Sequence, residues 1–91
     1  MAVEQMVEID VDGTAVSAPR EVVSALAAAA AARAGVSERH RELSLLLGGA
    51  LESGHVSLVD GSLLALRAVL EEGHGDRFGS AGAELRRAVT A

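Results

Sequence analysis

The sequence predicts a mostly helical α+β domain, with an N-terminal β-hairpin followed by three to four short helices. Three observations carry this prediction. Apolar residues alternate with polar ones on both sides of an early Asp-Gly pair. Strong helix formers in apolar stripes, separated by glycines and capping serines, fill most of the remaining chain. The length of 91 residues, without a linker or an internal repeat, suits one domain over residues 1–91.

The β-hairpin is expected over residues 3–18. The first half alternates apolar and acidic residues, which is the period-two pattern of a strand with one buried face. Asp12-Gly13 indicates a two-residue turn, because glycine tolerates a positive φ. Such a turn brings the apolar residues of both strands to one face. The pairs expected to face each other are Val7–Ala18, Ile9–Val16 and Val11–Thr14.

Helical segments follow the hairpin, and local signals suggest where each begins and ends. Pro19 fits the first turn of a helix, and Gly35 is the expected C-terminal stop. Ser37 is a favourable N-cap, and Gly54 ends the second helix. Residues 55–59 are compatible with either a third strand beside the hairpin or a loop. The expected helices span residues 19–34, 38–52, 62–72 and 81–89.

The composition predicts self-association. Apolar residues make up 49% of the chain and are mostly Ala, Val and Leu, with Phe78 as the single aromatic residue. A domain of this size buries only about 60–65% of the surface that its unfolded chain exposes. The leucine and alanine faces are too numerous for one small monomer to cover, so we expect a homodimer.

The charge and residue usage exclude several classes of protein. The formal net charge is −5, which disfavours nucleic-acid binding by bulk charge. All eight basic residues are Arg, a bias typical of GC-rich bacterial genomes. Without cysteine, the chain has neither a disulfide framework nor a thiol nucleophile. The start of the chain lacks the pattern of a secretory signal, and we expect a cytoplasmic protein without membrane contact.

No residue pattern points to catalysis, a cofactor or a metal. His40, His55 and His74 lie in three separate segments without metal-ligand spacing. Residues 10–14 resemble the DxDGT string of haloacid-dehalogenase-type phosphatases. That family needs a downstream lysine and a much longer chain, whereas this sequence contains no lysine. A hairpin turn explains the same residues, so we expect no catalytic, cofactor-binding or metal-binding residues, and an enzyme is the weakest reading.

One stretch favours a DNA-binding alternative. Residues 34–37 resemble the turn of bacterial helix-turn-helix repressors, in which a helix ends at Gly and a recognition helix begins at or near Ser. The resemblance implies that Arg39 and Arg41 contact DNA. The sequence departs from the pattern because Arg41 stands where these repressors place an apolar residue, and because Glu38 and Glu42 flank the arginines.

Two functional classes therefore remain. The first is a non-enzymatic protein-interaction module, such as an adaptor, an antitoxin-like protein or an accessory subunit, acting as a homodimer. In this class Glu8, Asp10 and Asp12 are the acids expected to face a protein partner. The alternative is a small DNA-binding transcriptional regulator that uses the segment around Gly35 and Ser37.

Overall fold

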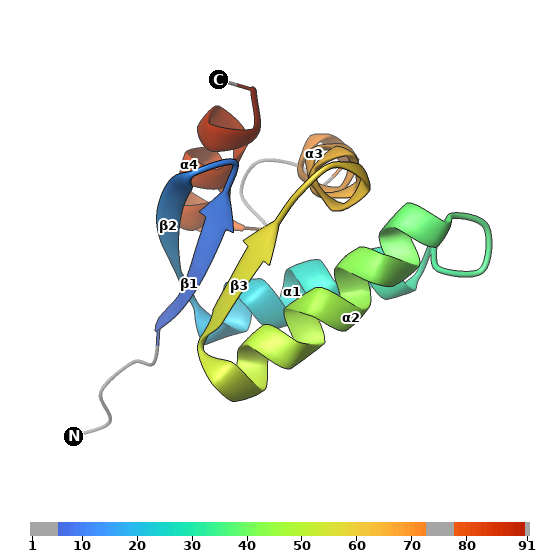
Figure 1. The fold of residues 1–91 in the computed structure, drawn as a ribbon, viewed down its shortest axis with the longest axis horizontal. Helices are drawn as coiled ribbons and strands as arrows, with labels where there is room; N and C mark the ends of the chain where they lie inside the picture. The colour runs from blue at the N-terminus through green and yellow to red at the C-terminus, as the bar shows by residue number, and fades with distance from the viewer. Residues whose placement is uncertain (1–5, 73–77, 91) are drawn as a thin grey trace.

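The computed structural model describes residues 6–72 and 78–90, which form three strands and four helices (Figure 1). This architecture confirms the α+β class and the hairpin followed by helices. The expected residues 3–5 of the hairpin lie outside the described part. The elements are β1 Met6–Val11, β2 Thr14–Pro19, α1 Arg20–Ala31, α2 Glu38–Ser53, β3 His55–Leu58, α3 Gly61–Glu72 and α4 Gly79–Thr90.

The hairpin has the predicted turn and register. Asp12 and Gly13 have φ angles of 50° and 88°, the positive values that a tight hairpin turn of this type requires. The side chain of Asp10 supports the turn, because its Oδ1 atom accepts a hydrogen bond of 3.0 Å from the Gly13 amide. The three pairs expected from the sequence are those observed: Val7–Ala18, Ile9–Val16 and Val11–Thr14.

Residues 55–58 form a strand, which resolves the choice that the sequence left open. β3 lies beside β1 and runs parallel to it, so the sheet order is β2-β1-β3. Val56 pairs with Ile9, and Leu58 pairs with Val11. The α1–α2 helical pair carries the chain back so that β3 starts at the same end of the sheet as β1 (Figure 1). This pairing is stabilised because it buries the two apolar side chains of β3 under the helices.

The ends of α1 and α2 follow different local rules. α1 ends at Ala31 and not at residue 34, because the amides of Arg33 and Ala34 bond to carbonyls three residues earlier and tighten the chain. Gly35 does not have a positive φ and is therefore not the expected stop. Gly54 does have one, at 85°, and it ends α2 as predicted.

α3 and α4 both begin slightly earlier than predicted. α3 starts at Gly61, because the carbonyl of Asp60 accepts hydrogen bonds from the amides of Leu63 and Leu64. α4 starts at Gly79 and not at residue 81. The buried Phe78 precedes it and accepts a hydrogen bond from the Gly82 amide. Among the described helices, none is long and apolar enough to cross a membrane.

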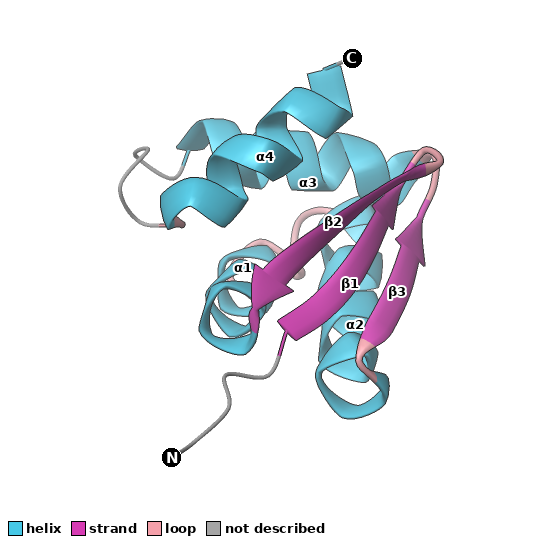
Figure 2. Ribbon diagram, turned by 90° about the vertical axis from the view of Figure 1, so that its left-hand side faces the viewer, coloured by secondary structure: helices cyan, strands magenta, loops and turns pink. Residues whose placement is uncertain are grey.

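The core lies between the helices and one face of the sheet (Figure 2). Alternate residues of all three strands are buried on this face, apart from the exposed Thr14 beside the turn, and the residues between them are exposed or, like Asp10, half-buried. The opposite face of the sheet carries no described helix and is called the open sheet face below. The largest fully buried apolar side chains are Val7, Ile9, Val11, Val23, Leu26, Leu43, Leu47, Leu58, Leu66 and Leu85.

Candidate binding groove

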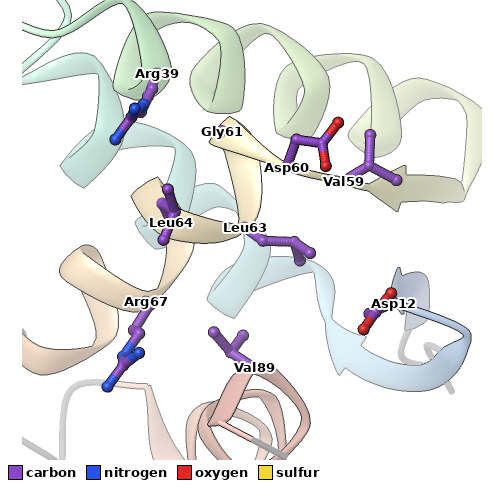
Figure 3. A pocket seen from close by; sticks show the side chains of 9 residues that line it. All are labelled: Asp12, Arg39, Val59, Asp60, Gly61, Leu63, Leu64, Arg67 and Val89. Carbon is purple, nitrogen blue, oxygen red and sulfur yellow. The ribbon is translucent and has the colours of Figure 1, made fainter.

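A shallow groove of about 630 Å³ opens where four elements meet (Figure 3). α3 and the β3–α3 connection supply most of its lining, and the hairpin turn, the first turn of α2 and the last turn of α4 supply the rest. This volume is in the range of known ligand and peptide pockets, about 300–1,000 Å³. The residues that line the groove are Asp12, Arg39, Val59, Asp60, Gly61, Leu63, Leu64, Arg67 and Val89.

The groove has an apolar lining, with Leu63 at its centre, Leu64 toward the arginines and Val59 beside Asp60 (Figure 3). Val59 and Leu64 are 62% and 51% exposed, and Leu63 and Val89 beside them are partly buried. Val59 directly follows β3 and is fixed by Ser62, a side chain that is only 1% exposed. The Ser62 hydroxyl accepts a hydrogen bond from the Val59 amide at 3.1 Å and donates one to its carbonyl at 2.7 Å. Val59 is thus held at the groove by its backbone, and Leu64 is exposed on α3.

Two carboxylates stand at one end of the groove. Asp12 comes from the hairpin turn and Asp60 from the connection between β3 and α3 (Figure 3). Both residues have a positive φ, 50° and 49°, a conformation that Asp tolerates better than most residues. Both side chains are exposed, and neither forms an ion pair within the described part of the chain. We call this the acidic end.

Two guanidinium groups stand at the opposite end, called the basic end (Figure 3). Arg39 lies against Gly61, where an added Cβ would be 3.2 Å from the Arg39 Cγ atom. Within residues 6–72 and 78–90, Arg39 forms no ion pair. Arg67 pairs with Glu71 at 3.3 Å, but both side chains are about half exposed, so this pair contributes little. The groove therefore has a basic end, an apolar centre and an acidic end.

The two arginines that the helix-turn-helix resemblance singled out do not share a surface. They are two positions apart on α2, which separates them by about 200° around the helix. Arg39 lines the groove, whereas Arg41 lies at a separate depression of about 190 Å³ together with Glu38, Glu42 and Leu45. α2 runs back along α1, so the two helices form a helical hairpin (Figure 1).

The three acids predicted to face a partner are also divided between two surfaces. Glu8 and Asp10 lie on β1 with their side chains toward the open sheet face, whereas Asp12 belongs to the groove. Glu8 lies 4.0 Å from the Nε2 atom of His55 across the sheet. Asp10 accepts the hydrogen bond from the hairpin turn. Interactions within the fold thus engage both acids of the open sheet face.

The histidines do not form a metal site in the described part of the chain, where no group of three or more potential ligands gathers. The Nδ1 atom of His40 lies 2.8 Å from the hydroxyl of Ser37, and its Nε2 atom is buried without a hydrogen-bond partner. The His40 side chain is partly buried. His74 lies outside the described residues.

Sequence reasoning missed the apolar centre of the groove. Leu64 falls off the apolar stripe that Leu63, Leu66 and Leu70 make along α3, and such an off-stripe leucine is the signal that was available. Nothing local showed that Val59 and Val89 would meet it. Comparisons with protein-family models, curated proteins and solved structures gave no match to this chain. The groove and the open sheet face therefore carry the functional argument.

Proposed function

We propose that this chain is a non-enzymatic protein-interaction module that contacts its partner through the groove. The observation that carries the proposal is the exposure of two large apolar side chains in the groove, Val59 at 62% beside Asp60 and Leu64 at 51% near Arg39 and Arg67. Protein interfaces combine an apolar centre with a polar, charged rim, and the energy of binding comes mainly from the centre. An adaptor, an antitoxin-like protein or an accessory subunit would use such a surface.

The open sheet face supports this choice by contrast. Its exposed side chains on β2 and β3 include Ala15, Ser17 and Ser57, which offer little apolar area. Asp10 on this face is bonded to the hairpin turn, and Glu8 lies 4.0 Å from the imidazole of His55. A contact surface there would gain little from desolvation, whereas the groove has apolar side chains to bury.

Self-association is part of the proposal. The core is thin, with one small sheet covered on one face, and several large apolar side chains remain exposed. A homodimer would cover some of that area. Sedimentation equilibrium on the full chain tests this directly, because a dimer has twice the protomer mass of 9.2 kDa.

The role of the groove is tested by affinity capture with the tagged full chain as bait, in cells of the source organism. Three baits are compared: the unchanged chain, Leu64→Asp in the groove, and Leu45→Asp as the matched control. Leu45 is 69% exposed on α2, at the small separate depression. Both changes place a charge on an exposed helical position, so both variants should fold.

We expect the unchanged chain and Leu45→Asp to retain the same protein in stoichiometric amount after nuclease treatment. Leu64→Asp should lose it. The retained protein is either another chain or the endogenous copy of this one. Equal capture by all three baits would contradict a role for the groove. Recovery of nuclease-sensitive DNA alone would favour the alternative of a transcriptional regulator.

A further inference from the structure

We infer that the partner seated on the groove is a second copy of this chain, related by a two-fold axis through the apolar centre. The inference rests on the proposed function, since it names the partner of the same surface. It starts from the order of the side chains in Figure 3. Arg39 and Arg67 stand at one end, and Asp12 and Asp60 stand at the other.

This order makes the groove complementary to itself. In a two-fold contact the same surface is used by both copies, and each end of one copy meets the opposite end of the other. The basic end of one groove then lies over the acidic end of its partner, and this contact occurs twice. Leu63 of each copy lies nearest to the axis, and Leu64 of each copy faces Val59 of the other. A groove with charges of one sign, or with acidic and basic residues mixed at each end, would not be complementary to a second copy of itself.

The net charge of the chain narrows the choice of interface. Each copy carries −5, so two copies repel at most relative orientations. The groove has two arginines and two aspartates and is locally neutral. A two-fold contact through the open sheet face would instead bring Glu8 and Asp10 of both copies together. On the described part of that face, His55 is the basic residue beside these acids.

The second copy would not have to break strong contacts. Asp12, Asp60 and Arg39 form no ion pair within the described chain, so they are available without competition. The pair between Arg67 and Glu71 is an exposed i,i+4 pair that contributes little to stability. The charged ends therefore replace contacts with water by contacts with the partner copy. Most of the free energy of association comes from burial of the apolar side chains.

The first experiment measures the mass of the full chain by sedimentation equilibrium from micromolar to millimolar concentration. We expect reversible dimerisation of the unchanged chain and of Leu45→Asp with similar dissociation constants. Leu64→Asp should raise the dissociation constant roughly tenfold or more, because it places a charge in the apolar part of the interface. Circular dichroism verifies that both variants keep their helices.

The second experiment tests whether the basic end of one copy lies over the acidic end of the other. One double variant, Arg39→Glu with Arg67→Glu, is acidic at both ends of the groove. The other, Asp12→Asn with Asp60→Asn, has a neutral end in place of the acidic one, and Asn tolerates the positive φ of both positions. In a mixed dimer, the intact acidic end of the first faces the intact basic end of the second. Native mass spectrometry of the mixture should therefore show more heterodimer than random pairing gives.

Each outcome decides something. A chain that stays monomeric at all concentrations overturns the inference, while loss of a foreign protein by Leu64→Asp in the capture experiment would still support the proposed function. A dimer that Leu64→Asp leaves intact also overturns it and places the interface elsewhere, such as the free edge of β3. A heterodimer fraction equal to or below that of random pairing contradicts the contact between the basic end of one copy and the acidic end of the other.

Discussion

The groove and the open sheet face are both exposed and both carry charged side chains, yet they differ in what their residues contact. On the open sheet face, Glu8 lies across from His55, and Asp10 is bonded to the hairpin turn. In the groove, Asp60 and Arg39 have no ion-pair partner in the described chain, and large apolar side chains lie between them.

This difference shows that exposed charge alone does not mark a contact surface. A solvated strand face also alternates apolar and charged residues, because water stabilises the charges. An exposed apolar centre is less easily explained by solvation, since it forgoes the gain of burial. Glu8 and Asp10 were predicted from the sequence to face a partner, and in the structure Asp10 also accepts the hydrogen bond from the hairpin turn.

The largest expected effect compares the two faces of β3. Leu58 is fully buried and precedes Val59 at the rim of the groove, whereas Ser57 points to the open sheet face. Leu58→Ala should lower the free energy of unfolding by about 2–5 kcal/mol through lost burial and a cavity. Ser57→Ala should change it by less than about 0.5 kcal/mol.

Urea denaturation at one fixed protein concentration measures both, because dimerisation would make stability depend on concentration. A loss for Ser57→Ala as large as that for Leu58→Ala would show that the open sheet face is covered in solution, and the comparison would fail.

A smaller effect is expected at the support of the groove rim. Ser62→Ala removes the hydroxyl that bonds to both backbone groups of Val59 and leaves the Val59 amide without that acceptor. We expect a loss of about 1–3 kcal/mol in the free energy of unfolding. Ser53→Ala is the matched control. Its hydroxyl donates to the carbonyl of His55 and accepts from its amide, as Ser62 does with Val59, but at an exposed position where water can replace it. Equal effects of the two variants would argue against a fixed rim.

Asp10 should contribute through the hairpin turn and not through a partner. Asp10→Ala removes the acceptor of the Gly13 amide and should cost about 1 kcal/mol. Asp10→Asn keeps an acceptor oxygen and should recover most of that loss. Thermal denaturation of the three chains measures this. If Asp10→Asn is as damaging as Asp10→Ala, the charge itself matters, and the open sheet face has a role that the turn does not explain.

The smallest effect is expected at Glu8. Its pair with His55 spans 4.0 Å, and both side chains are more than half exposed. Glu8→Gln should change the free energy of unfolding by less than about 0.5 kcal/mol and should leave the dissociation constant of the dimer unchanged. Weaker self-association of Glu8→Gln in sedimentation equilibrium would place the interface on the open sheet face.

Part of the groove was within reach of sequence reasoning. Arg39 and Asp12 were both singled out, the first as a DNA contact and the second as a partner-facing acid, and the structure places both at the groove. The sequence grouped them with Arg41 and Asp10, because neighbours along a chain look like neighbours in space. Side chains two positions apart on a helix point in different directions, so Arg39 and Arg41 lie on different surfaces. At a hairpin turn the chain leaves the sheet, so Asp12 is separated from Asp10.

The sequence by itself determined the features that depend on nearest neighbours. Asp12-Gly13 sets the turn, and the alternation before and after it sets the strand register. Ser37 and Gly54 bound α2, because caps act through the backbone groups beside them. These interactions span a few residues and need no knowledge of the rest of the chain.

The tertiary structure alone decided β3 and the groove. β3 has four residues, and its partner β1 lies more than forty positions earlier in the chain, beyond the helical pair that returns it. Val59, Leu64 and Val89 come from three different segments that meet only after the helices pack on the sheet. Burial of a shared core sets such long-range contacts, and no local pattern records which distant residues will share it.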